Sequence, residues 1–138
     1  MNQTAILWPM LAQVLLVYLV YLVLGVRRYG AIRTGAAKPQ QFKLRSTEPE
    51  PSVTAANNVA NQFELPVLFY AACLSYVVTD KVTAVPLVLA WLFVASRYAH
   101  AFVHVTTNKL FWRSRAFQLG WLLLLILWLW LTFSLASD

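Results

Sequence analysis

The side chains most able to do chemistry in this sequence lie inside segments that are otherwise apolar. Asn57, Asn61 and Glu64 recur at spacings of four and three residues. On a helix they fall within roughly 60° of one another, on a single face. An ionisable group such as Glu64 is costly inside a bilayer, and such groups usually face a bundle interior or a water-filled cavity with a partner. The spacing therefore predicts a polar face on this segment.

A second polar face occurs later in the chain. On a helix Arg97, His104 and Asn108 fall within about 40° of one another, and His100 lies about 60° to one side. If the two segments are antiparallel neighbours, Arg97 and Glu64 reach similar depths, which predicts an ion pair between them. Such a pair either fixes the register of the helices or faces a ligand, and both roles stay open.

The two histidines could also bind a metal, because residues four apart share a helical face. However, the only carboxylate near His100 and His104 is Glu64, and Cys73 lies far outward on a different face. We therefore expect no metal. As the single cysteine of the chain, Cys73 also excludes a disulfide scaffold.

The elements that must position these residues are membrane spans. Of the 138 residues, 60% are apolar and 12% are charged, and the mean hydropathy is +0.62. Soluble domains are about half apolar and about a quarter charged, so this composition excludes an ordinary soluble fold, a disordered chain and a coiled coil. The length allows a single domain over residues 1–138.

Four apolar runs are long enough to cross a bilayer, namely residues 5–26, 58–79, 82–105 and 116–135. A helix of 22 residues measures roughly 33 Å, against a hydrocarbon core near 30 Å. The sequence thus predicts an all-α, integral membrane four-helix bundle with a kink at Pro66. We expect the first run to stay in the protein, because no basic residue precedes it and Arg27 and Arg28 follow it.

Basic residues predict the orientation of these spans. Ten of the eleven Lys and Arg residues lie in or beside the connections 27–57 and 106–115. An excess of Lys and Arg marks cytoplasmic loops, so both connections are predicted inside and both termini outside. The long inner loop 27–57 is expected to lack regular structure over much of its length and could contact anionic lipid. Despite the net charge of +6, no nucleic-acid partner is expected, because no aromatic and basic platform accompanies the charge.

These motifs resemble those of one known family. The stretch 57–70, with Asn61, Glu64 and Pro66, is similar to the second-helix signature of the MAPEG family, the membrane-associated proteins in eicosanoid and glutathione metabolism. The segment from Arg97 to His104 resembles the third-helix motif of that family. The resemblance covers essentially the whole chain, and the chain looks like a bacterial-type member of the family. It implies a bacterial inner-membrane protein that forms a homotrimer, with glutathione in a polar crevice between subunits near the cytoplasmic side.

The resemblance also implies a set of glutathione-binding residues, which are Asn61, Glu64, Arg97, His100 and His104. The two histidines stand where the conjugating members of the family have tyrosines. Arg113 and Arg115 are the candidates for a cation that favours the thiolate, the reactive form of a thiol. The implied activity is that of a glutathione transferase or peroxidase acting on lipophilic small molecules.

Besides the two histidines, Asn57 departs from the pattern of the glutathione users of the family and keeps other functions open. Those enzymes commonly carry an arginine four residues before the motif asparagine, where this chain has Asn57. An amide cannot replace that charge beside a carboxylate. The alternative is a non-catalytic, MAPEG-like membrane binding or scaffold protein that does not use glutathione. An enzyme that uses another cosubstrate, with the histidines as acid–base groups, also stays open. A transporter stays open too, although we expect no broken helices of the kind that transporters use.

Overall fold

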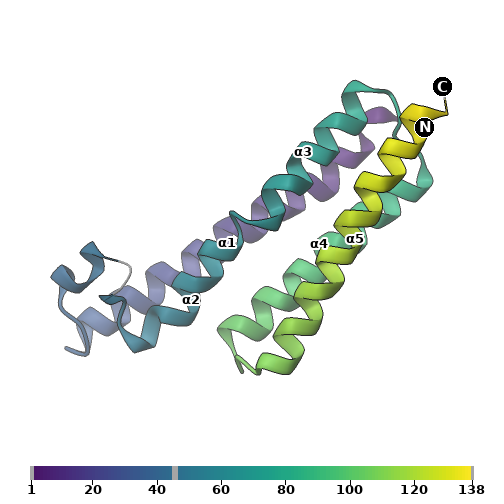
Figure 1. The fold of residues 1–138 in the computed structure, drawn as a ribbon. Helices are drawn as coiled ribbons and strands as arrows, with labels where there is room; N and C mark the ends of the chain where they lie inside the picture. The colour runs from purple at the N-terminus through teal and green to yellow at the C-terminus, as the bar shows by residue number, and fades with distance from the viewer. Residues whose placement is uncertain (1, 45–46, 138) are drawn as a thin grey trace.

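The computed structural model describes residues 2–44 and 47–137, and every regular element in that part of the chain is helical. In chain order the elements are η1 (Gln3–Ile6), α1 (Leu7–Arg33), η2 (Pro39–Lys43), α2 (Glu50–Asn61), α3 (Leu65–Val78), α4 (Ala84–Val105) and α5 (Leu110–Ala136). The molecule is elongated, with α1 running beside α2 and α3, and with α4 and α5 forming a long hairpin (Figure 1). The predicted all-α class is confirmed.

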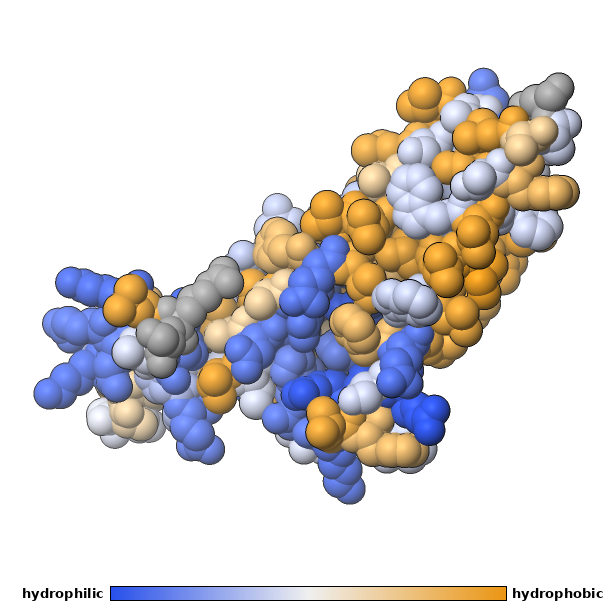
Figure 2. Space-filling view, viewed as in Figure 1, coloured by the Kyte–Doolittle hydropathy of each residue, from blue (hydrophilic) through white to orange (hydrophobic). Residues whose placement is uncertain are grey.

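Three of the described helices are long and apolar enough to cross a membrane, namely Gln3–Arg33, Ala84–Val105 and Leu110–Ala136. Their large apolar side chains are widely exposed, as expected where the solvent is lipid. Figure 2 shows hydrophobic residues covering the end where the chain begins and finishes, and hydrophilic residues gathered toward η2 and the α4–α5 turn. The chain is an integral membrane protein.

The second predicted span is not one continuous helix. α2 ends at Asn61 and α3 begins at Leu65, so the break lies at residues 62–64 and not at Pro66. Proline lacks the N–H that the carbonyl of Gln62 would need, and its ring clashes with that carbonyl, so a helix arriving from α2 cannot continue. Pro66 itself sits in the first turn of α3, where the missing N–H costs little. The expectation that no helix is broken is therefore wrong.

The connection after the first long helix is more ordered than predicted. Within the loop expected at residues 27–57, α1 continues to Arg33 and α2 begins at Glu50, so residues 34–49 lie between the two helices. Arg28 donates from Nε and Nη2 to the two oxygens of Glu48, at 2.9 and 2.6 Å, and Ser52 Oγ donates to Glu48 Oε1 at 2.6 Å. The Arg28 guanidinium also lies 5.2 Å from the centre of the Phe42 ring. These contacts tie η2 and the start of α2 to α1.

α4 and α5 pack closely together, which sets how the polar residues of the two helices lie relative to one another. A Cβ on Gly120 would lie 2.8 Å from Ser96 Oγ, so only glycine permits this approach. Toward the end of the molecule with the termini, Tyr76 Oη donates to the carbonyl oxygen of Leu127 at 2.8 Å and joins α3 to α5. The core around this contact is apolar and contains few polar side chains.

A chain of buried amides crosses from α1 to α4 beside the break. Gln13 Nε2 donates to Gln62 Oε1 at 3.0 Å, and Gln62 Nε2 donates to Asn58 Oδ1 at 3.0 Å. Asn58 Nδ2 then donates to the carbonyl oxygen of Ala101 at 3.1 Å. All three side chains are fully or almost fully buried, so these bonds hold the irregular turn between α2 and α3 in an apolar setting.

Candidate functional site

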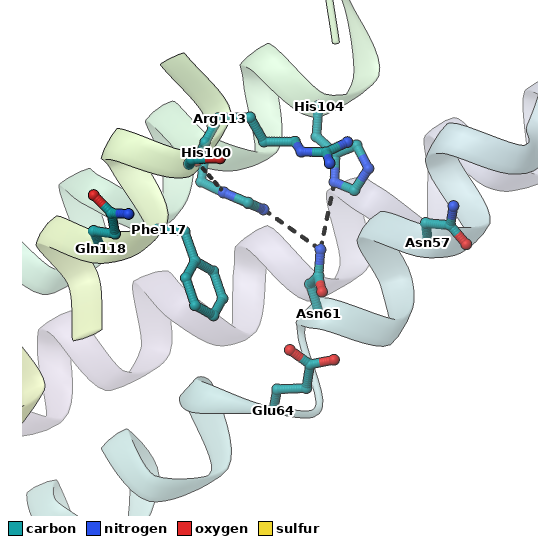
Figure 3. Close-up of a pocket in the computed structure, with 9 residues that line it drawn as sticks. Asn57, Asn61, Glu64, His100, His104, Arg113, Phe117 and Gln118 are labelled. Carbon is teal, nitrogen blue, oxygen red and sulfur yellow. Dashed lines mark hydrogen bonds between the residues drawn. The ribbon is translucent and has the colours of Figure 1, made fainter. Parts of the chain in front are cut away.

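A polar cavity of about 450 Å³ lies between the break in the second span and the α4–α5 hairpin. It is lined by Asn57, Asn61, Glu64, His100, His104, Arg113, Ser114, Phe117 and Gln118. Figure 3 shows Asn61 and Glu64 facing it from the α2–α3 side, with the two histidines and Phe117 on the opposite side. The cavity therefore brings residues of the α2–α3 segment together with residues of the α4–α5 hairpin, which lies far from it in sequence.

Asn61 lies at the centre of a small polar network. Its Nδ2 atom lies 3.5 Å from His100 Nε2 and 3.5 Å from His104 Nδ1 (Figure 3). The two imidazole rings meet edge to face with their centres 5.5 Å apart. His100 Nδ1 lies 3.0 Å from the carbonyl oxygen of Arg113, which links α4 to α5. One amide thus faces both histidines, which share a face of α4.

Arg97 is fully buried beside the cavity. Its Nη2 donates to the carbonyl oxygen of Asn61 at 3.1 Å, at the negative end of the α2 dipole. The guanidinium lies 5.6 Å from the centre of the Phe117 ring, and Phe117 lines the cavity. Nε and Nη1 of Arg97 have no hydrogen-bond partner in the described part of the chain. A buried cation with two unsatisfied donors is costly, so the site favours an additional acceptor.

The predicted ion pair between Arg97 and Glu64 is not formed. Within residues 2–44 and 47–137 the salt bridge is instead that of Arg28 with Glu48. Glu64 is exposed at the cavity and interacts with Arg97 only through space. The prediction assumed one helix through this segment, whereas Glu64 precedes the first residue of α3 with φ −101° and ψ −104°, outside the helical register.

The structure separates the two predicted thiolate-stabilising arginines. Arg113 lines the cavity, and its Nη1 donates to Asn108 Oδ1 at 2.6 Å. Arg115 does not line it, and its guanidinium lies 5.3 Å from the Phe111 ring on another part of α5. Residues two apart on a helix point in very different directions, so the two could not both face the cavity.

Three cavity residues of α5 were not found by sequence reasoning, namely Ser114, Phe117 and Gln118. The available signal was their spacing, because Phe117 follows Arg113 by four residues and shares its helical face. No group of three or more His, Cys, Asp or Glu that could hold a metal occurs in the part of the chain that the structure describes. The chemistry available here is therefore that of cations, amides, imidazoles and one carboxylate around a water-accessible cavity.

A comparison with protein-family models finds one match, the MAPEG family, over residues 5–133. This range includes every residue that lines the cavity as well as Arg97. No curated protein and no solved structure matches the chain.

Proposed function

The chain belongs to the MAPEG family, and from this premise we propose that it is a membrane enzyme that binds glutathione in the polar cavity and conjugates it to lipophilic electrophiles. The observation that carries the proposal is the fully buried Arg97 beside that cavity, with two donors left without a partner. A carboxylate of glutathione is an acceptor suited to these donors, because a hydrogen bond between a guanidinium and a carboxylate is charge-assisted and strong.

The remaining cavity residues fit the other groups of glutathione. Arg113 offers a second cation, whereas Glu64 offers a carboxylate that suits the free ammonium of the tripeptide. Asn61 can exchange hydrogen bonds with a peptide group. A volume of about 450 Å³ falls within the usual range for small-molecule sites, roughly 300–1,000 Å³.

The membrane arrangement we propose has four crossings, formed by α1, α2 with α3, α4 and α5. The loops rich in Lys and Arg would face the cytoplasm of a bacterial cell and both termini the outside, in accord with the termini lying at one end of the molecule (Figure 1). A homotrimer would place a neighbouring subunit beside the open side of the cavity. Glutathione would then arrive from water, and the electrophile from lipid.

In the proposed reaction the thiolate sulfur of glutathione attacks an electrophilic carbon. A sulfur–carbon bond forms, and the bond to the leaving group breaks, with the leaving group taking the electron pair. Arg113 is the cation positioned in the cavity to favour the thiolate. The same thiolate could reduce a lipophilic hydroperoxide, with a second glutathione completing a disulfide.

Calorimetry and a conjugation assay on the detergent-purified protein test this proposal. We expect glutathione to bind at millimolar concentration or below, and to react with a chlorodinitrobenzene-type electrophile. Arg97→Ala and Glu64→Gln should weaken binding about tenfold or more, which corresponds to one charge-assisted hydrogen bond. Arg113→Gln should slow conjugation, whereas the matched Arg115→Gln should not. Absence of binding to the folded wild type at millimolar glutathione would contradict the proposal.

One observation favours a second candidate, a non-catalytic membrane binding or scaffold protein with the same cavity. Asn57 lines the cavity as an exposed amide, at a place where a cation would strengthen glutathione binding. If this candidate is correct, Asn57→Arg should raise glutathione affinity from an undetectable to a measurable level, with no turnover. If the enzyme is correct, the wild type conjugates without that change.

A further inference from the structure

A single hydrogen bond fixes which nitrogen of His100 carries hydrogen. His100 Nδ1 lies 3.0 Å from the carbonyl oxygen of Arg113, and a carbonyl oxygen can only accept. The hydrogen therefore resides on Nδ1, and in the neutral imidazole the lone pair is left on Nε2. When one ring nitrogen of a histidine donates to a backbone carbonyl, the tautomer and the direction of the other nitrogen are fixed, which suits that nitrogen to accept a proton or bind a ligand.

The free lone pair of His100 faces the cavity. Nε2 lies 3.5 Å from Asn61 Nδ2, which also lies 3.5 Å from His104 Nδ1 (Figure 3). An amide nitrogen of this kind has two hydrogens to donate and accepts none, so both imidazole atoms opposite it are acceptors. Because 3.5 Å is long for a hydrogen bond, a better donor that enters the cavity can replace Asn61 as the partner of Nε2.

The charges around this lone pair suit a proton transfer that creates an anion. Arg97 lies behind the cavity and Arg113 lines it, while His104 faces the same amide and Glu64 lies at the exposed side. Two cations near the developing thiolate stabilise its negative charge. They also repel the imidazolium that forms on His100, and the adjacent thiolate offsets that repulsion because it pairs with the imidazolium. Within the described residues, the backbone hydrogen bond to Arg113 orients the ring of His100, whereas the ring of His104 is oriented by the long contact with Asn61.

We propose that His100 Nε2 is the general base that takes the thiol proton of the bound cosubstrate, an inference that rests on the proposed function. The sulfur–hydrogen bond breaks, the proton moves to Nε2, and sulfur keeps the electron pair. The thiolate then forms a bond to the electrophilic carbon as the leaving group departs with its pair. The imidazolium returns its proton to water that enters the open side of the cavity.

The substitution His100→Asn tests this role, because its amide can still donate near the position of Nδ1 but has no basic nitrogen. We expect glutathione affinity, measured by calorimetry, to fall much less than the rate of conjugation does. Conjugation should fall about a hundredfold or more, the usual contribution of a general base. The ultraviolet absorbance of thiolate in the bound complex should disappear at neutral pH. The remaining rate should rise in proportion to hydroxide, because free glutathione then ionises by itself.

A measurement on the wild type keeps the proposal testable if the variant does not fold. When His100 accepts the proton, thiolate forms without release to the buffer, so binding heats should not depend on the ionisation enthalpy of the buffer. Release of about one proton on binding would overturn the role of His100. So would thiolate absorbance or conjugation that His100→Asn leaves unchanged. Failure of the wild type to bind glutathione would instead overturn the proposed function, and this inference with it.

Discussion

The contact between Gly120 and Ser96 sets how closely α4 and α5 can approach. A methyl group on Gly120 would lie 2.8 Å from Ser96 Oγ and 3.6 Å from the Cδ atom of Arg97. Ser96 cannot easily rotate away, because its Oγ donates to the carbonyl oxygen of Phe93 at 2.6 Å. Gly120→Ala should therefore push the two helices apart beside the buried arginine.

The size of the effect follows from two opposing terms. Alanine is favoured over glycine inside a helix by about 0.5–1 kcal/mol. Forcing one extra methyl into a well-packed contact costs about 1–3 kcal/mol. Gly25 provides the matched control, because nothing lies within 4 Å of a Cβ at that position of α1. Gly120→Ala should consequently be about 2 kcal/mol less stable than Gly25→Ala.

Equilibrium unfolding in one mixed-detergent series, followed by circular dichroism, measures this difference. The double variant Gly120→Ala with Ser96→Ala should recover most of the loss, giving a coupling energy of about 1–2 kcal/mol. Ser96→Ala alone should cost little, because its hydroxyl bonds only to its own helix. Equal stability of the two glycine variants, or no recovery in the double variant, would refute the packing argument.

Three further predictions concern contacts outside the cavity. The Arg28 guanidinium donates hydrogen bonds to the Glu48 carboxylate and so holds the pKa of Glu48 below its ordinary value. This pair therefore stabilises the fold at pH values above that ordinary value and stops doing so as the pH falls through the lowered pKa. Amide exchange protection of residues 47–53 should drop on acidification in the wild type, by at most about 1 kcal/mol since Arg28 is partly exposed, and should be low and pH-independent in Glu48→Gln. Gln62→Met should lower the free energy of unfolding in detergent by about 2–4 kcal/mol, because it leaves the buried amides of Gln13 and Asn58 without their partner. Gln13→Met should cost clearly less, because Gln13 Oε1 already has no partner, and equal costs would contradict the amide chain. Tyr76→Phe removes one buried hydrogen bond to α5 and should lower the free energy of unfolding by about 1 kcal/mol in the same assay, and no change would contradict that bond.

The helical class and the membrane setting were predictable because they depend on the length and composition of apolar runs. The break at residues 62–64 was not, because the hydropathy of the segment 58–79 is continuous and the effect of Pro66 falls on the turn before it. The early start of α2 was missed for another reason. Residues 50–57 contain no long apolar run, and the start of their helix is held by the contact of Glu48 with Arg28, which is remote in sequence.

The site was predictable where a single regular helix relates the residues. Angular spacing placed His100 and His104 together because α4 is unbroken through both. Glu64 lines the cavity with Asn57 and Asn61 as predicted, but its ion pair with Arg97 does not form, because the break between α2 and α3 takes Glu64 out of the helical register. The position of Phe117 in the cavity, next to His100, could not be predicted, because it depends on how α5 packs against α4 at the close approach of Gly120.

The break between α2 and α3 also has a consequence for how the protein enters the bilayer during synthesis. α3 has 14 residues and measures about 21 Å, which is too short to span a hydrocarbon core of roughly 30 Å on its own. The polar α2 would gain little by partitioning into lipid. We therefore expect the translocon to release α2–α3 only when α4 has emerged from the ribosome. The α2–α3 segment and α4 would then insert together, as a helical hairpin around the turn at residues 79–83.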